Sequence, residues 1–350
     1  MTAQKKGKNK KTAAGMVCSI LGILLSIIML ANLPESSNKS SSTKSESSKA
    51  SVTTEETTAA KPTKDMAGND ITVPEKVNKI VSMSPSTTRL LVDLGLSDKI
   101  VACDTYSYSY YGDSLSKDVS QFDMMSPDNE AIVALDPDIV FTTGMSYSGG
   151  TDVYASVRES DICLADLPTA ASLSEIEKDI QFVGDCTGSS DDAEKIVKEM
   201  KDSLKEISKL SSKITDQKTV LYETSTPTAD SPAIYSAGTG TYIDEALSLI
   251  GAKNVAANGD QWPALTEEAA IGLNPDVIIT TDTYTENVVD TLKSLAGWEN
   301  VTAIKNNDVY LLTDSNEMNQ PNQHVVSGII EMAKDIYPDV YGDLKDPFSK

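Results

Sequence analysis

Residues 189–213 read SSDDAEKIVKEMKDSLKEISKLSSK, and this stretch decides how the chain is organised. Its apolar residues recur at three- and four-residue steps, which predicts an amphipathic helix; they are Ala193, Ile196, Val197, Met200, Leu204, Ile207 and Leu210. Capping oxygens and acidic groups begin the stretch and lysines dominate its last turns, as the helix dipole favours. At helical rise the element is about 35 Å long, so it can run the length of a small domain.

The sequences on the two sides of this helix resemble each other. Residues 129–143 read NEAIVALDPDIVFTT, and residues 267–281 read EEAAIGLNPDVIITT. The copies align at a constant offset of 138 residues, so Glu130 matches Glu268. Two copies are too few for a solenoid, which needs about three repeats. The pattern therefore predicts two related lobes joined by one long helix.

Strands and helices alternate within each of the two regions. The first region is expected to hold strands at residues 77–83, 99–103, 138–142 and 162–165, with helices between them. The second region repeats this scheme with strands at residues 219–223, 277–281 and 309–312. Short connections between alternating elements are typical of a parallel sheet covered by helices on both faces. The predicted fold class is α/β, with two similar parallel-sheet lobes, a single bridging helix and a ligand cleft between the lobes.

The length of 350 residues suggests about two domains, preceded here by segments of different composition. We expect a cytoplasmic basic segment, a membrane anchor or signal segment, a disordered Ser/Thr-rich tether, an N-terminal lobe, the connecting helix and a C-terminal lobe. Their respective bounds are residues 1–12, 13–33, 34–64, 65–187, 188–214 and 215–350. The tether holds almost no apolar residue, so it cannot bury enough surface to fold.

The N-terminal segment has the pattern of a membrane anchor. Five lysines precede residues 13–33, which carry no charge and are long enough to cross a hydrocarbon core of about 30 Å. The positive-inside rule keeps these lysines in the cytoplasm and places the rest of the chain outside the cell. A cleaved signal peptide is the alternative, although Met29-Leu30-Ala31 is a poor cleavage site. Cys18 lies near the start of the apolar run, so we do not expect it to carry a lipid.

Charge and cysteine usage exclude several classes of function. After residue 64 the chain holds 20 basic and 48 acidic residues, and a body this acidic does not bind nucleic acid nonspecifically. The cysteines show no C-x-x-C spacing, so neither a zinc site nor a redox pair is predicted. The spacing leaves open a disulfide among Cys103, Cys163 and Cys186.

The cleft between the lobes is the expected ligand site, because ligands bind beyond the carboxyl ends of the strands in open α/β sheets. The predicted loops at these ends are rich in aromatic residues, which give large contact area at small entropic cost. The expected ligand-binding residues are Ser84, Tyr106, Tyr108, Tyr147, Tyr235 and Trp262. The alternative for each tyrosine is that it packs its own loop. Trp262 is the strongest candidate, because it is one of two tryptophans and precedes a proline in a loop.

Catalysis has little support in the sequence. There is no nucleophile-elbow, phosphate-loop or dinucleotide motif, and His324 is the only histidine. We expect His324 to be partly exposed at the start of the last helix. A bare transition metal is usually held by several imidazoles and carboxylates, so one histidine disfavours a metal site as well. No enzyme activity and no intrinsic cofactor are predicted.

Several of these motifs together resemble the substrate-binding proteins of ABC importers for ferric siderophores, haem and vitamin B12. The resemblance extends over about residues 65–341. It rests on residues 79–95 (KIVSMSPSTTRLLVDLG), 130–138 (EAIVALDPD), 262–268 (WPALTEE), 274–276 (NPD) and 309–310 (VY). It implies a two-lobe receptor in which Glu130 and Glu268 dock on basic residues of the permease. The segments around Tyr106 and Trp262 are similar to cleft segments of the vitamin-B12-binding members.

The sequence departs from this family at two places. Arg89 stands where many members have glutamate, and residues 319–324 (NQPNQH) replace a loop that often contains two arginines. Arg89 and Arg158 are the only arginines of the chain. Strongly anionic siderophores need arginine clusters, because a guanidinium pairs with carboxylate or catecholate oxygens. We therefore expect a neutral or weakly charged chelate, either a ferric hydroxamate or a corrinoid such as cobalamin.

The resulting prediction is a monomeric, non-enzymatic receptor with an extracellular body and an anchor in the cell membrane. It would capture the metal chelate and deliver it to an ABC permease and its ATPase. The alternative is a surface ligand-sensing or haem/chelate relay protein that is not coupled to a permease.

Overall fold

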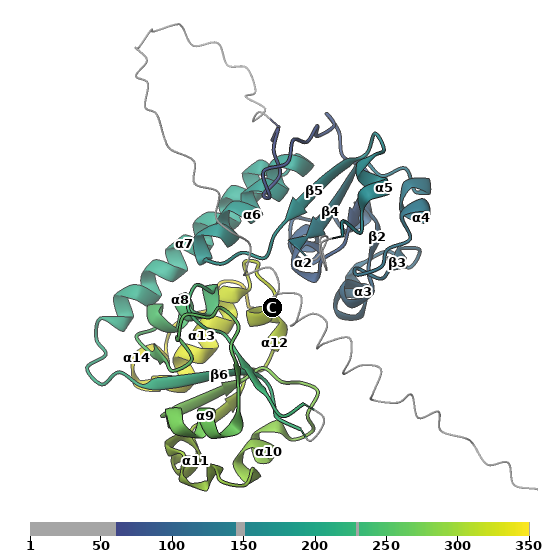
Figure 1. The fold of residues 1–350 in the computed structure, drawn as a ribbon. Helices are drawn as coiled ribbons and strands as arrows, with labels where there is room; N and C mark the ends of the chain where they lie inside the picture. Colours follow the sequence, from purple (N-terminus) through teal and green to yellow (C-terminus); the bar gives the residue numbers. More distant parts are fainter. Residues whose placement is uncertain (1–60, 145–150, 229–230, 350) are drawn as a thin grey trace, which may run out of the picture.

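The computed structural model describes residues 61–144, 151–228 and 231–349 (Figure 1). The expected anchor, residues 13–33, and the expected tether up to residue 60 lie outside these ranges. Within them, no helix is long and apolar enough to cross a bilayer. The last residues of the expected tether contact the folded body, since Lys61 Nζ donates to the Cys186 carbonyl at 3.0 Å and the Ile71 amide donates to the Thr63 carbonyl at 3.0 Å.

The N-terminal lobe contains a five-stranded sheet in the order β3-β2-β1-β4-β5, and every pairing in it is parallel. The strands are β1 (Ile80–Ser82), β2 (Ile100–Asp104), β3 (Ser120–Phe122), β4 (Ile139–Thr143) and β5 (Cys163–Leu167). The short helices of this lobe are α2 (Pro85–Asp93), α3 (Thr105–Tyr111), α4 (Asn129–Ala134) and α5 (Ala155–Arg158). Strands β1, β2, β4 and β5 are largely buried on both faces, as expected for a parallel sheet between helices, whereas the edge strand β3 is partly exposed.

The C-terminal lobe contains a six-stranded sheet that is mixed rather than parallel throughout. Strand β10 pairs in parallel with β6 and β11, and β8 pairs in parallel with β6. Strand β7 pairs antiparallel with both β6 and β9. The strands are β6 (Thr219–Ser225), β7 (Ile234–Ser236), β8 (Lys253–Asn254), β9 (Ala264–Leu265), β10 (Val277–Thr280) and β11 (Val309–Leu311). Its helices are α8 (Tyr242–Leu249), α9 (Glu267–Leu273), α10 (Val288–Ser294), α11 (Thr302–Asn306), α12 (Ser315–Asn319), α13 (Val325–Ile336) and α14 (Pro338–Tyr341).

Two packed helices connect the lobes. Helix α6 (Leu173–Thr187) ends at Gly188 in the left-handed conformation, and α7 (Ser190–Ser211) begins directly after it. A Cβ on Gly184 would lie 2.3 Å from the Ala193 Cβ, so a side chain there would force the two helices apart. The predicted long helix is confirmed as α7, which extends from one lobe to the other (Figure 1).

The sequence repeat appears as a structural repeat. Helix α4 and strand β4 have their counterparts in α9 and β10, at the offset of 138 residues seen in the sequence. The repeated aspartates play the same part in both lobes. Asp138 Oδ2 accepts the Lys79 amide at 2.9 Å, and Asp276 Oδ2 accepts the Thr219 amide at 2.9 Å. Each aspartate directly precedes one strand, β4 or β10, and its carboxylate binds the backbone where the neighbouring strand, β1 or β6, begins.

Two predictions of local structure were wrong. The tyrosine-rich segment after β2 is the helix α3 and not a loop, because Asp104 Oδ1 accepts the Tyr106 and Ser107 amides and so caps a first turn. Tyr235 lies in strand β7 rather than in a loop. The three described cysteines, Cys103, Cys163 and Cys186, are buried free thiols, so none of them forms a disulfide with another.

Candidate ligand-binding cleft

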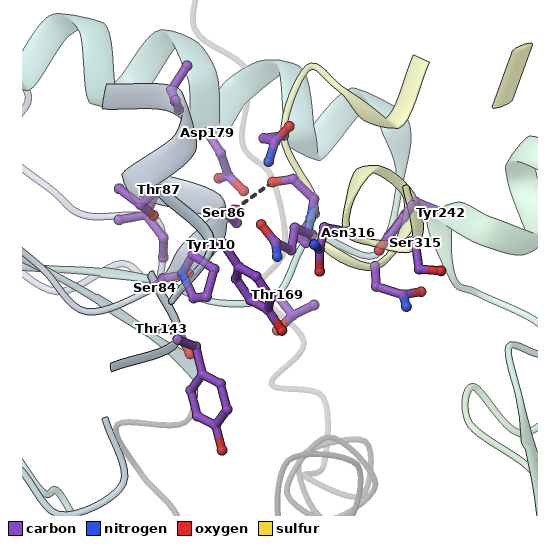
Figure 2. Close-up of a pocket in the computed structure, with 18 of the residues that line it drawn as sticks. Ser84, Ser86, Thr87, Tyr110, Thr143, Thr169, Asp179, Tyr242, Ser315 and Asn316 are labelled. Atoms are coloured by element: carbon purple, nitrogen blue, oxygen red, sulfur yellow. Dashed lines mark hydrogen bonds between the residues drawn. The ribbon is translucent and has the colours of Figure 1, made fainter. Parts of the chain in front are cut away.

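A cavity of about 280 Å³ lies between the two lobes. Its lining follows the carboxyl ends of the strands: Ser84 follows β1, Thr143 ends β4, Leu167 ends β5, and Thr281 follows β10. Thr143 and Thr281 are equivalent positions of the repeat, so each lobe contributes the same hydroxyl to the cavity. Figure 2 shows Thr143, Ser84 and Tyr110 gathered on one side and Ser315, Asn316 and Tyr242 on the other.

The lining is largely aromatic, hydroxyl and amide in character. Five aromatic side chains reach the cavity, namely Tyr106, Tyr110, Tyr242, Trp262 and Tyr284. Tyr110 and Tyr284 are 40% and 56% exposed, so they are available for contact from solvent. Burial, and then the neighbouring Tyr284, raise the pKa of Tyr110, so its hydroxyl stays protonated. Among the described lining residues, none is Lys, Arg or His, and Asp179 is the one carboxylic acid.

The structure places the predicted ligand-binding residues in three groups. Ser84, Tyr106 and Trp262 come together in the cavity lining. Tyr108 packs against the hydrophobic core of its lobe, and Tyr235 lies in β7; neither belongs to the described lining. Tyr147 falls outside the described residues.

Other lining residues were missed from the sequence. Thr143 and Thr281 carried a usable signal, because both copies of the repeat end in two threonines at the end of a buried strand. Tyr110 and Tyr284 fall in the predicted aromatic loops but are not among the predicted ligand-binding residues. Asp179 lies within α6 and had no distinguishing signal in the sequence.

A segment of the C-terminal lobe, residues 315–324, forms the cavity wall nearest the connecting helices. It is held in place from its own lobe, because Tyr242 Oη donates to the Met318 carbonyl at 2.7 Å and Tyr222 Oη donates to Asn319 Oδ1 at 2.9 Å. It is also held from the other lobe, because Ser86 Oγ donates to the Pro321 carbonyl at 2.8 Å. Asn316, Asn319 and Asn322 therefore line the cavity as part of a supported wall.

The same segment carries a polar cluster that joins the lobes, made of Arg89, Asp93, Gln323 and His324. His324 Nε2 lies 2.7 Å from Asp93 Oδ2 and 2.8 Å from Arg89 Nη2, and Gln323 Nε2 donates to Asp93 Oδ2 at 2.5 Å. Burial raises the pKa of Asp93, but the hydrogen bonds and charges of His324 and Arg89 outweigh it, so this pKa lies below its usual value.

The position of His324 differs from its predicted partial exposure, and it explains why arginine stands at position 89. His324 is only 5% exposed rather than partly exposed, because α2 of the other lobe covers it. Arg89, the residue in place of the family's glutamate, is engaged with Asp93 and His324 rather than lining the main cavity. Within the described residues, no group of three or more His, Cys, Asp or Glu side chains could hold a metal ion.

Glu130 and Glu268 occupy matching places on the two lobes. Each lies in the first turn of a short helix, α4 or α9, and each is exposed. The helices are capped by Asp128 and Thr266, whose side chains accept the Ala131 and Ala269 amides. The two carboxylates are therefore presented to solvent on equivalent rigid supports. Neither residue lines the cavity within the described part of the chain.

Comparison with known proteins agrees with this architecture. The family described as periplasmic binding protein matches residues 80–315. A *Bacillus subtilis* relative, named as the uncharacterised ABC transporter substrate-binding lipoprotein YvrC, is 32% identical over 282 residues, which cover 79% of this chain and 85% of the relative. A cobalamin-binding protein of *Halobacterium salinarum* is 24% identical over 278 residues, covering 77% of this chain and 72% of that protein.

A solved structure shows the same fold. The molybdate-binding periplasmic protein MolA of *Haemophilus influenzae* superposes with a TM-score of 0.68 and 20% sequence identity, covering 82% of this chain and 94% of that one. The two lobes, the long connecting helix, the cavity between the lobes and the extent of the family match lead to one conclusion. The chain belongs to the periplasmic binding protein family.

Proposed function

We propose that this protein is the substrate-binding receptor of an ABC importer. The observation that carries the proposal is the cavity formed at the strand ends of two lobes related by a sequence repeat. The relative named as an ABC transporter substrate-binding lipoprotein supports it, since it is similar over most of both chains. The receptor binds its ligand without converting it and acts as a monomer.

The ligand is a neutral or weakly charged metal chelate, either a corrinoid or a ferric hydroxamate. The aromatic side chains suit a large, partly apolar ligand, and the hydroxyl and amide groups suit its polar substituents. A strongly anionic ligand would be left without a partner, because the described lining offers no cationic side chain. The cobalamin-binding relative supports the corrinoid alternative. Ser84, Tyr106 and Trp262 are the proposed contacts of the ligand.

Glu130 and Glu268 are the proposed docking residues for the permease. Their exposure and equivalent positions support a role in which each lobe meets one basic site on the permease. The body lies outside the cell and is anchored to the membrane by the N-terminal segment. The name of the *B. subtilis* relative supports membrane attachment but attributes it to a lipid.

Binding to a panel of chelates tests the ligand proposal. The full-length protein in detergent is mixed with cyanocobalamin, a neutral ferric trihydroxamate, haem and an anionic ferric tricatecholate. Native mass spectrometry and absorbance spectra then report the bound species. We expect one of the first two to bind and the tricatecholate not to bind. Binding of the tricatecholate alone, or of no chelate, would overturn the proposed ligand class.

Cell fractionation tests the attachment. If the apolar segment is the anchor, a Cys18→Ser variant stays in the membrane fraction, and external protease digests its folded body. Release of this variant to the medium would show that a lipid on Cys18 holds the protein.

A further inference from the structure

Asp179 is the carboxylic acid of the described cavity lining, and it lies within helix α6. Figure 2 shows its side chain extending from the helix toward Ser86, at the end of the cavity where the two lobes meet. Helices α2 and α8, one from each lobe, pack against α6. They contribute Ser86, Thr87, Leu90, Tyr242 and Ile243 to the lining, and none of these is charged. The Asp179 carboxyl is therefore surrounded by uncharged groups on the cavity side.

This carboxyl has no hydrogen bond or ion pair with any described residue. Its neighbours on the same helix are engaged elsewhere: Glu175 accepts the Ala171 amide at 2.7 Å, and Glu177 pairs with Lys201. The fully buried carboxylates of the described residues have partners; Asp166, for example, pairs with Arg158, and Asp282 accepts the Thr226 amide, whereas Asp179 is half-buried. Asp179 thus differs from them in that its oxygens are free to accept a bond from a ligand.

The surroundings make the ionised form of Asp179 costly while the cavity is empty. Burial, followed by the negative charge of Glu175, raises the pKa of Asp179 to about 7, and Lys178 opposes this shift. A donor group placed against the carboxylate would offset that cost, because a hydrogen bond to a charged group is stronger than one between neutral groups.

We propose that Asp179 is a specificity residue of the cleft, which binds a hydrogen-bond-donating nitrogen of the ligand, either an ammonium group or an amide N–H. This inference rests on the proposed function. The same carboxylate disfavours ligands that bring a carboxylate or catecholate to this end of the cavity, since two anions would then meet in a poorly hydrated space. The chain therefore selects its ligand by one acid in a cavity without cationic side chains among its described residues.

The test compares wild type with Asp179→Asn, which keeps the shape of the side chain and removes its charge. Two ferric trihydroxamates serve as probes: ferrioxamine B, which has a terminal ammonium, and its N-acetyl derivative, which is neutral. Cyanocobalamin, whose side arms end in amide N–H groups, is the third probe. Affinities are measured by calorimetry on the full-length protein at pH 6, 7 and 8. Asp185→Asn is the control, because Asp185 lies on the same helix, outside the described lining, and accepts a bond from Gln181.

We expect wild type to bind the ammonium probe more tightly than the acetylated probe by roughly tenfold or more at pH 8, as a charge-assisted hydrogen bond would give. The preference should shrink at pH 6 and disappear in Asp179→Asn, whereas Asp185→Asn should keep it. If cyanocobalamin is the probe that binds, its affinity should rise between pH 6 and pH 8 in wild type and stay constant in Asp179→Asn.

Three outcomes would overturn the inference. One is an unchanged affinity and pH profile in Asp179→Asn. Another is a cyanocobalamin affinity that falls as the pH rises, since the protonated acid would then be donating to a ligand carbonyl. The third is that none of the three probes binds, and this result would also overturn the ligand class of the proposed function. The first two outcomes require a bound probe, so they overturn the role of Asp179 alone.

Discussion

Trp262 and Trp298, the two tryptophans of the chain, occupy different environments. Trp262 is half-buried and lines the cavity, whereas Trp298 is 1% exposed and lies in a separate hydrophobic cluster of the C-terminal lobe. This difference makes Trp262 a candidate reporter of binding and Trp298 a background signal that can be removed.

We predict that ligand binding quenches the fluorescence of Trp262. The experiment uses a Trp298→Phe background, so that Trp262 is the single source of the signal. Trp262→Ala should weaken binding by about 2 kcal/mol, the size expected for an aromatic anchor in a cleft. Should Trp262→Ala instead lower the melting temperature and leave the affinity unchanged, Trp262 would be a packing residue of its own loop.

Glu223 gives a prediction about stability and pH. It is 1% exposed at the end of β6, and burial, followed by the charge of Asp282, raises its pKa to about 8, although Thr280 donates a hydrogen bond to it. A carboxyl with a raised folded-state pKa holds its proton more tightly when the protein is folded. The stability it contributes is therefore full below its unfolded pKa and is lost as the pH rises toward 8.

We expect Glu223→Gln to remove this loss, because glutamine resembles the protonated acid. The melting temperature of the variant should match wild type near pH 5 and exceed it at pH 8. Glu194→Gln, on the exposed face of α7, is the control and should follow wild type at both values. A constant difference between Glu223→Gln and wild type across this range would show that Glu223 is ionised in the folded protein.

The elements divide into those that local sequence predicts and those that distant contacts create. Helix α7 and the repeated units were predictable, because their periodicity and their copy are visible within short windows. Helix α3 was not, since Tyr106, Tyr108 and Tyr110 alternate with serines rather than forming a helical pattern of apolar residues, and its start depends on the Asp104 side chain. Strands β7 and β9 have three and two residues; β7 exists through its pairing with β6, and β9 through its pairing with β7.

The same distinction applies to the site. Ser84 and Tyr106 follow predicted strands, and Trp262 stands out as one of two tryptophans and as the residue before a proline, so all three could be found from the sequence. Asp179 and Tyr242 lie in helices, so their place in the cavity depends on how α6 and α8 pack between the lobes. The burial of His324 likewise depends on Asp93 and Arg89, which lie 231 and 235 positions away from it along the chain.

Helices α4 and α9 support the prediction on permease docking. Reversing both charges, in Glu130→Lys/Glu268→Lys, should abolish uptake while ligand affinity and melting temperature stay near wild type. One exposed ion pair contributes only about 0.2–1 kcal/mol, so a single neutralised glutamate should have little effect, whereas two reversed charges add repulsion.

The control is Glu194→Lys/Glu206→Lys, which makes the same change of charge on the exposed face of α7 and should leave uptake intact. Normal uptake by the Glu130/Glu268 variant would exclude the docking role. Loss of ligand binding in that variant would instead mean that these glutamates support the cleft.

At the scale of the whole molecule, the described residues join the lobes at several places. Helix α7 runs between them on one side (Figure 1), and the cluster of Arg89, Asp93, Gln323 and His324 joins them again near the cavity. Leu173 at the start of α6 also donates its amide to Glu245 of α8 at 2.8 Å. Together with the Ser86–Pro321 hydrogen bond, these connections restrict the relative motion of the lobes more than one helix would.

We therefore predict a small change in shape on ligand binding. Solution scattering should show little fall in the radius of gyration when the ligand is added to wild type. The Gln323→Ala/His324→Ala variant lacks the side chains that the C-terminal lobe contributes to the polar cluster, so its ligand-free form should be more extended and should contract more on binding. A large contraction of wild type would show that these connections do not restrain the lobes.

The wall made by residues 315–324 has a consequence for biosynthesis. The N-terminal sheet uses residues 80–167, so it is complete in a growing chain long before this wall has been translated. Domains generally fold in the order of their synthesis. A half-made receptor therefore holds every strand of its first sheet but no ligand site, and it gains that site only when the last tenth of the polypeptide has been made.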